Sequence, residues 1–189
     1  MMRKDGFTLI ELLVTSVVLG IMVAIAIPGF SSWLPNYRLK GAAREVYSNM
    51  QLARLGAIRG NTDWAIVFDA GVTPGRYFIC SDDGANDTWD GPPAVGGDDV
   101  AEKTVDLADY GNSVSYGHGS ATTPIDTTFG DDITYTPPDN VAVFNPRGTG
   151  SNGYVYLQNN KNTTTYGVGT LNSGVVRLLK WNSSTSKWE

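Results

Sequence analysis

The chain has 189 residues, enough for one ordinary domain and an additional long helix. Hydrophobic residues make up 41% and charged residues 17% of the sequence, which excludes an intrinsically disordered chain. The net charge of −5 disfavours a generally basic nucleic-acid-binding protein, and the single cysteine, Cys80, excludes a disulfide within the chain.

The N-terminal stretch is a short charged leader followed by a long apolar run. Two basic residues and an aspartate precede Gly6, and the residues Phe7–Ile27 are mostly apolar. As a helix this run spans roughly 31 Å, which matches the hydrocarbon core of a bilayer. Glu11 interrupts the run, and a carboxylate at the centre of a bilayer costs about 2.5–3.5 kcal/mol on insertion scales. We therefore predict a transmembrane helix in which Glu11 has a specific partner.

The segment GFTLIELL carries a family signal. Between a basic leader and an apolar helix, it resembles the N-terminal signal of type IV pilins and of the pseudopilins of type II secretion. The resemblance implies that a prepilin peptidase cleaves between Gly6 and Phe7 and methylates the new N-terminus at Phe7. It also assigns Glu11 to neutralising the amine of an adjacent subunit, and Pro28 to the point where the helix loosens on filament assembly. Asp5 departs from the family pattern, which more often has a basic or small polar residue there.

Two other interpretations of this segment fit less well. A secretory signal peptide has a shorter apolar core followed by a small-residue cleavage site, and no such site ends this run. A plain membrane anchor explains the length of the run, but it gives no reason for Glu11. The pilin-like interpretation accounts for both features.

Residues 36–60 have the pattern of an amphipathic helix that ends at Gly60 and Asn61. Its apolar stripe predicts a face packed on a sheet. The opposite face has five basic residues and one acid, which favours a solvated face near anionic lipid headgroups. Contacts with acidic loops of neighbouring subunits and nucleic-acid binding are the alternatives. The stripe consists of Leu39, Ala43, Val46, Met50, Ala53 and Ala57, and Tyr47 and Ile58 widen it.

Residues 61–189 are predicted to form an antiparallel β domain, because apolar runs alternate with turn-rich segments. The first two strands should form a hairpin. The strongest candidate strands are Trp64–Asp69, Arg76–Cys80, Val141–Asn145, Gly153–Gln158, Tyr166–Gly169 and Val175–Trp181. Shorter candidates in the polar section between them are Lys103–Leu107, Ser113–Tyr116 and Ile133–Tyr135.

The acidic loops of this domain raise the question of calcium, because Ca²⁺ binds six to eight oxygen ligands, often from carboxylates. We expect solvated loops and no bound metal or cofactor, with calcium as the alternative. The pattern of an EF-hand is absent, since DDGANDTWDG lacks the terminal glutamate. The calcium candidates are Asp82, Asp83, Asp87 and Asp90, which Asp98, Asp99, Asp131 and Asp132 could approach in space.

No catalytic constellation is apparent in the sequence, and we predict that the chain is not an enzyme. The single histidine, His118, lies in a glycine-flanked loop without a nucleophile motif, and is expected at the surface. Cys80 ends an apolar strand and is expected to be a buried structural thiol. Phosphate-binding and zinc-binding motifs are also missing from the sequence.

Two further segments resemble the GspH/FimT subgroup of pilin-like proteins: LARLGAIRGN, at residues 52–61, and FNPRGTGSNGYVYL. This resemblance implies an α+β pilin fold, in which the long N-terminal helix packs on an antiparallel sheet domain. It implies a minor pseudopilin of a type II secretion system, with a structural role in filament assembly and protein secretion. The alternative is a minor type IV pilin, similar to FimT, that primes pilus assembly with or without DNA uptake. The C-terminal tail lacks the basic motif that some FimT proteins use to bind DNA.

The predicted organisation has three parts: a removable leader, residues 1–6; a transmembrane and assembly helix, residues 7–35; and a periplasmic domain, residues 36–189. The domain comprises the helix 36–60 and the β domain 61–189 with its acidic loops. The basic leader places the N-terminus in the cytoplasm of a bacterium, with a single pass through the inner membrane. The expected partners are prepilin peptidase, other pilin or pseudopilin subunits, the inner-membrane assembly platform and the lipid bilayer, but not nucleic acid. After assembly, the subunit is expected in a pseudopilus or pilus filament.

Overall fold

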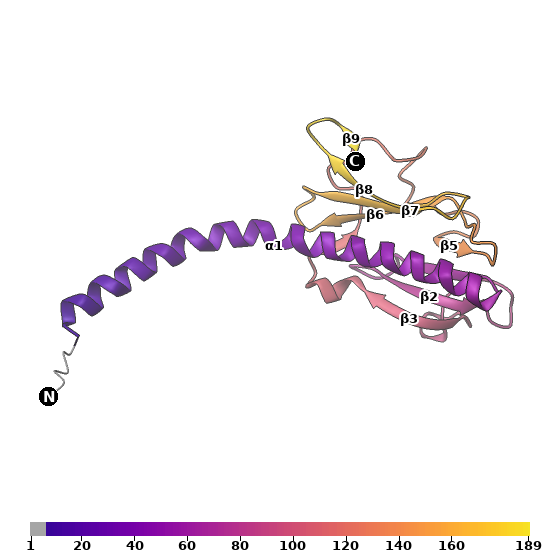
Figure 1. Ribbon diagram of the computed structural model, residues 1–189, viewed down its shortest axis with the longest axis horizontal. Helices are drawn as coiled ribbons and strands as arrows, with labels where there is room; N and C mark the ends of the chain where they lie inside the picture. The colour runs from indigo at the N-terminus through magenta and orange to yellow at the C-terminus, as the bar shows by residue number, and fades with distance from the viewer. Residues whose placement is uncertain (1–6) are drawn as a thin grey trace. The chain divides into compact units, whose positions relative to one another are not determined.

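The computed structural model describes the backbone of residues 7–189 and the side chains of residues 7–25 and 33–189. The chain divides into two compact units, Met1–Leu34 and Pro35–Glu189. One helix, α1 (Leu9–Gly60), contributes to both units (Figure 1). Among the described residues, no helix combines the length and the hydropathy that crossing a membrane requires.

The helix α1 is continuous over 52 residues, including Pro28 and Pro35. Neither proline ends the helix, although each lacks the backbone N–H that an interior helical position would donate. The helix ends as its sequence predicts, because Asn61 follows Gly60 in the left-handed conformation with a φ of 51°. The side chain of Pro28 and the whole leader, including Gly6, lie outside the described residues.

The first sheet has the strand order β3-β2-β1-β5, with every neighbouring pair antiparallel. The predicted hairpin is confirmed by the pairing of Ala65 with Cys80 and of Asp69 with Arg76. The strand predicted at Lys103–Leu107 lies earlier in the chain, because Leu107 begins a short 3-10 helix, η2 (Leu107–Tyr110). The strands are β1 (Trp64–Asp69), β2 (Arg76–Asp82), β3 (Val100–Asp106) and β5 (Val141–Phe144).

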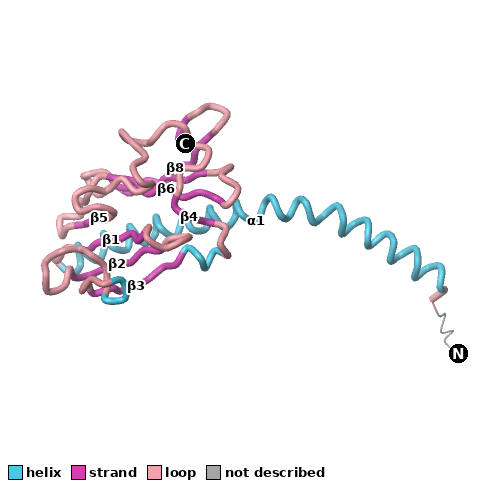
Figure 2. The backbone as a smooth tube through the Cα atoms, turned by 180° about the vertical axis from the view of Figure 1, so that it is seen from behind, coloured by secondary structure: helices cyan, strands magenta, loops and turns pink. Residues whose placement is uncertain are grey.

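The second sheet has the order β4-β6-β7-β8-β9 and is also antiparallel. Its strands β4, β6 and β8 are labelled in Figure 2. The strand predicted at Ile133–Tyr135 is wrong, because this segment makes only an isolated bridge between Ile133 and Val155. The terminal strand β9 was not predicted, because two residues are too short to show an alternating pattern. The strands are β4 (Val114–Tyr116), β6 (Gly153–Asn159), β7 (Thr165–Thr170), β8 (Val176–Asn182) and β9 (Lys187–Trp188).

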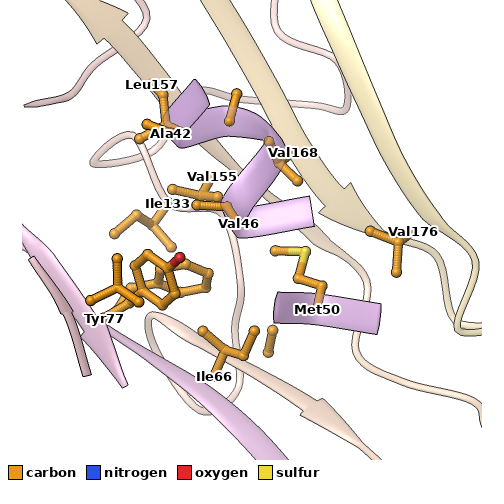
Figure 3. Close-up of a cluster of buried hydrophobic side chains, with 14 of the residues drawn as sticks. Ala42, Val46, Met50, Ile66, Tyr77, Ile133, Val155, Leu157, Val168 and Val176 are labelled. Atoms are coloured by element: carbon orange, nitrogen blue, oxygen red, sulfur yellow. The ribbon is translucent and has the colours of Figure 1, made fainter. Parts of the chain in front are cut away.

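The main core lies where residues 35–60 of α1 meet both sheets. All six residues of the predicted stripe are completely buried, so the stripe is confirmed as a core face. In Figure 3, Val46 and Met50 of the helix lie between Ile66 of the first sheet and Val168 of the second. The prediction that Ile58 widens the stripe is wrong: Ile58 is 43% exposed, because it is about 100° around the helix from its buried neighbour Ala57.

A second, smaller core covers the opposite face of the first sheet. Successive side chains of a strand point to opposite faces, and in β1 Ile66 and Phe68 enter the main core while Ala65 and Val67 enter the second. This second cluster also contains Phe78, Cys80 and Val141, and Trp89 and Val95 pack against it from the connection between β2 and β3. Both faces of β1 are therefore covered, which explains its nearly continuous apolar sequence. The architecture confirms the predicted α+β fold of a long helix packed on antiparallel sheets.

Candidate functional site

The N-terminal segment of α1 presents apolar side chains on every side. Every side chain from Phe7 to Ile25 is exposed, and Phe7 and Leu9 are each 84% exposed. A contiguous apolar surface of this extent marks a site for lipid or for other protein chains. A helix that is apolar all round is typical of a buried environment, and the described residues bury none of these side chains.

Glu11 closes a capping box at the start of this helix. Its backbone N–H donates to Thr8 Oγ1 at 3.2 Å, and its Oε2 accepts from the backbone N–H of Thr8 at 3.5 Å. Such a reciprocal pair satisfies two backbone donors that the first helical turn otherwise leaves free. The spacing T-x-x-E in the sequence is typical of this motif, but the sequence analysis assigned Glu11 only to subunit assembly and did not predict its role in the cap. The carboxylate is thus held at the N-terminal end of the helix, close in sequence to Phe7.

The two segments that resemble the GspH/FimT subgroup contact each other in the fold. Arg54, from the first segment, donates from Nε to the carbonyl oxygen of Gly148 in the second, at 2.7 Å. A Cβ on Gly174 would lie 1.9 Å from that same oxygen, so the turn requires a glycine at this position. A Cβ on Gly56 would lie 2.6 Å from the Trp64 ring, so this glycine lets β1 approach the helix. These residues therefore join the end of α1 to both sheets.

A network of polar side chains joins residues 45–49 of α1 to β2, β3 and η2. Lys103 Nζ donates to Glu45 Oε1 at 2.8 Å and to Asn49 Oδ1 at 3.2 Å, and Asn49 Nδ2 donates to the hydroxyl of Tyr77 at 2.7 Å. The hydroxyl of Tyr110 donates to the other oxygen of Glu45. Burial opposes ionisation of Glu45, but the hydrogen bonds from Lys103 and Tyr110 outweigh it and lower its pKa. This network orients α1 on the first sheet. Glu45, the one acid on the polar face of residues 36–60, is its central acceptor.

Of the five basic residues between positions 36 and 60, two make hydrogen bonds within the folded domain and three are exposed. Arg38 donates to Ser113 Oγ at 3.0 Å, and Arg54 is bound to the turn described above. Lys40, Arg44 and Arg59 are exposed. Only part of the predicted solvated basic face is therefore available to lipid headgroups or neighbouring subunits.

His118 and Cys80, the residues considered for catalysis, both pack against other side chains of the fold. His118 Nδ1 lies 2.6 Å from Asp132 Oδ1, and the imidazole stacks on the Phe129 ring with the ring centroids 4.2 Å apart. The His118 imidazole is partly exposed, and its contacts are with the Asp132 carboxylate and the Phe129 ring. Cys80 is buried, as predicted, and burial together with the neighbouring Asp99 carboxylate raises the pKa of its thiol to about 12.

Only some of the acidic residues considered for calcium lie close together in the described part of the chain. Among the described residues, the acids that bring one ligand atom each within 4.8 Å of one another are Asp90, Asp98 and Asp99. Asp82 instead accepts the backbone N–H of Gly84 at 2.9 Å. The remaining candidates, Asp83 and Asp87, are also outside this cluster. The folding of the loop brings Asp98 and Asp99 to Asp90, so the two acids that the sequence placed further along the chain join one of the first four candidates.

The fold and the N-terminal signal define a pilin-like subunit. The family model of the prokaryotic N-terminal methylation motif matches residues 1–27. The model described as type II transport protein GspH matches residues 42–174, which include most of the packed part of α1 and most of the sheets. The chain therefore belongs to the GspH family of type II transport proteins, as the sequence resemblance predicts.

Two individual proteins are similar to this chain. A pilin-like protein, PilA1 of Thermus thermophilus, is 37% identical over 91 residues, which cover 47% of this chain and 55% of PilA1. The match thus spans about half the length of that relative. The structure of the minor pseudopilin EpsH from the type 2 secretion system of Vibrio cholerae matches with a TM-score of 0.51, covering 75% of this chain and 96% of EpsH. At 14% identity, this second likeness shows the fold alone.

Proposed function

We propose that this chain is a minor pseudopilin, a structural subunit of the pseudopilus in a type II secretion system. Membership of the GspH family supports this function, and so does the fold shared with EpsH. The role is one of assembly, and membership of a family of transport proteins supports it. The proposal depends most on one observation, the exposed apolar segment between Phe7 and Ile25.

This segment would meet lipid before assembly and neighbouring helices afterwards. In the inner membrane, its apolar side chains are covered by acyl chains, with the N-terminus in the cytoplasm and the folded domain in the periplasm. In a filament, the same side chains pack against equivalent helices of other subunits, with the inner-membrane assembly platform mediating the transfer. One apolar surface therefore serves two environments in succession.

Prepilin peptidase would prepare the subunit by cleaving between Gly6 and Phe7 and methylating the amine of Phe7. The match to the N-terminal methylation motif supports this step. The new amine would lie directly before Thr8, the residue that caps α1. Mass spectrometry of the chain from its native host should show Phe7 as the first residue, with one added methyl group. A mature chain that retains residues 1–6 would contradict the proposed processing.

Glu11 would then pair with the methylated amine of an adjacent subunit. Its carboxylate is exposed and its hydrogen bond to Thr8 is long, at 3.5 Å, so little is lost when it binds a cation instead. Between packed apolar helices, such a pair fixes the register of the subunits, because leaving either charge unpaired is costly. Pro28 remains our candidate for the position at which α1 adjusts during assembly.

The test of this mechanism is the incorporation of Glu11 variants into filaments. Glu11→Ala and Glu11→Gln should still be cleaved and remain in the membrane fraction, but should be lost from sheared filaments. Thr15→Ala provides a matched control, because it removes another polar group from the same exposed segment. Normal incorporation of Glu11→Ala would contradict the proposed role of Glu11 without affecting the family assignment.

A second candidate function is that of a minor type IV pilin that primes pilus assembly, and the similarity to the pilin-like protein of Thermus thermophilus favours it. Deletion of the gene distinguishes the two functions. Loss of exported proteins from the culture medium supports the pseudopilin, whereas loss of surface pili with normal export supports the pilin. A gel shift with the full chain in detergent tests DNA uptake, and the absence of binding at low salt would exclude it.

A further inference from the structure

The loop between β2 and β3, residues 83–99, is built around a cluster of carboxylates. The cluster contains Asp90, Asp98 and Asp99, each with one oxygen within 4.8 Å of the others. Residues 81–99 include no lysine, arginine or histidine, so the loop itself supplies no cationic side chain to this cluster. Three ionised carboxylates at such distances repel one another, and a cation between them removes this repulsion.

Two oxygens of the cluster are buried and have no hydrogen-bond partner. Asp99 is only 2% exposed, and its Oδ1 accepts no hydrogen bond within the described part of the chain. The same is true of Asp98 Oδ1, which is also shielded from solvent. The neighbouring thiol of Cys80 does not resolve this, because an S–H group is a weak donor. A buried charged group is ordinarily paired or bound to a metal, so these atoms indicate that a ligand is required.

The loop backbone holds the carboxylates in place through their other oxygens. Asp98 Oδ2 accepts the N–H of Ala85 at 2.9 Å, and Asp99 Oδ2 accepts the N–H of Gly91 at 2.8 Å. Asp90 Oδ1 accepts the N–H of Asp98 at 3.2 Å. One oxygen of the buried Asp99 and one oxygen of the half-buried Asp98 are thus used by the loop, and the Oδ1 atom of each is left for a ligand.

Glycines allow the backbone to approach this closely. A Cβ on Gly84 would lie 2.3 Å from Asp98 Oδ1, and Gly84 also has a φ of 74°. A Cβ on Gly97 would lie 2.2 Å from Asp90 Oδ1 and 2.0 Å from the carbonyl oxygen of Gly91. Any other residue at these positions would enter the space around the carboxylates.

We infer that Asp90, Asp98 and Asp99 form a binding site for a divalent cation, and that Ca²⁺ is the ion that fits it. Calcium–oxygen distances are about 2.3–2.6 Å, so two ligands of one ion lie at most about 5 Å apart. The three ligand atoms of the cluster meet this limit, since all lie within 4.8 Å of one another. Mg²⁺ requires shorter distances of about 2.0–2.1 Å and near-ideal octahedral geometry. Backbone carbonyls and water would complete the coordination. The site retains only Asp90 of the four candidates predicted from sequence.

The cation would fasten the loop over the second core. Trp89, next to Asp90, packs against the cluster that contains Phe78 and Cys80, while Asp99 directly precedes β3. An ion bound by Asp90 and Asp99 therefore connects the covering part of the loop to the edge strand of the first sheet. Removing the ion should loosen this cover while leaving the main core intact.

Calcium titration of the full chain in detergent micelles, after removal of metal with EDTA, tests the inference. Isothermal titration calorimetry should show one bound Ca²⁺, with a Kd of about 10⁻⁴–10⁻³ M, as in extracellular modules. Asp98→Asn and Asp90→Asn should weaken this binding at least about tenfold. Asp87→Asn is the matched control, because it removes an exposed acid from the same loop outside the cluster, and it should leave the Kd unchanged.

A second measurement keeps the test valid if the half-buried variant Asp98→Asn fails to fold. Asp90 is exposed, so Asp90→Asn should retain the circular dichroism spectrum of the unchanged chain. Tb³⁺ bound in place of Ca²⁺ should emit after excitation of Trp89, and this emission should fall in Trp89→Phe and be displaced by excess Ca²⁺. Absence of calcium binding at millimolar concentration would overturn the inference. Equal weakening in Asp90→Asn and Asp87→Asn would also overturn it, because it would show diffuse attraction to an acidic surface.

Discussion

The two ends of α1 have the same backbone conformation but opposite relations to water. Between residues 7 and 25, every side chain is exposed, whereas the stripe from Leu39 to Ala57 is completely buried. The difference lies in how apolar residues are arranged around the helix: on all sides in the first region and on one side in the second. The first region must find its partners outside the chain, and the second finds them in the two sheets.

The comparison explains how one helix combines attachment and folding. The stripe of the second region is buried against residues of both sheets, and the opposite side of the helix carries polar side chains, of which Lys40, Arg44 and Arg59 are exposed. No element of the described chain covers the first region, so its apolar surface remains available to lipid or to other subunits. Matched substitutions in the two regions test this division directly.

The largest contrast is expected between Met50→Ala and Met22→Ala. Met50 is completely buried in the main core, whereas Met22 is 64% exposed. Truncation of a buried methionine should lower the free energy of unfolding by about 2–5 kcal/mol, while Met22→Ala should leave the unfolding of the globular domain unchanged. Thermal and urea unfolding in detergent measure both variants. Similar losses in the two variants would show that the regions are not independent.

A smaller contrast is expected between Gly56→Ala and Gly20→Ala. The new Cβ at position 56 would lie 2.6 Å from the Trp64 ring, whereas at position 20 there is no neighbouring atom within 4 Å. Overpacking should therefore destabilise Gly56→Ala by about 1–3 kcal/mol. Gly20→Ala should not destabilise the domain, because alanine favours the helix and meets no obstacle. Tryptophan fluorescence during unfolding reports on the packing of Trp64 in both variants.

In the packed region, the ionised Glu45 carboxylate should contribute to the free energy of unfolding, and this contribution should depend on pH. Its folded-state pKa is lowered from the ordinary value of 4.5, so its carboxylate binds protons less readily in the folded chain. Glu45 therefore adds stability above pH 4.5, and this contribution disappears as the pH falls through the lower folded value. Unfolding measured from pH 6 to pH 3 should show a shallower acid loss in Glu45→Gln than in the unchanged chain.

The smallest effect is expected from Thr8→Ala in the exposed region. Loss of the capping hydroxyl should weaken the first turn of α1 by about 0.5–2 kcal/mol, because the backbone N–H of Glu11 loses its acceptor. Amide hydrogen exchange should become faster at residues 9–11, with no change in the unfolding midpoint of the domain. A lower midpoint would indicate that this turn contributes to the fold of the packed region.

Local patterns predicted most of the elements. The spacing of Leu39, Val46 and Met50 predicted the packed face of α1, and the alternating runs predicted the hairpin of β1 and β2. The segment Ile133–Tyr135 was assigned to a strand from its apolar residues alone, but its backbone makes only one bridge. Sheet membership depends on a partner that lies far away in the sequence, so short runs are ambiguous.

The sequence by itself determined the pilin-like class of this protein, its long helix and the residue that interrupts its apolar run. These features depend on periodicity and on short motifs, which are properties of consecutive residues. Only the tertiary structure decided which acids meet, because the loop between β2 and β3 folds back to bring Asp98 and Asp99 to Asp90. It also decided that Arg54 reaches Gly148 and that Gly56 admits Trp64. The contact of Arg54 with Gly148 joins residues 94 positions apart, and such a contact exists only once the chain has folded back on α1.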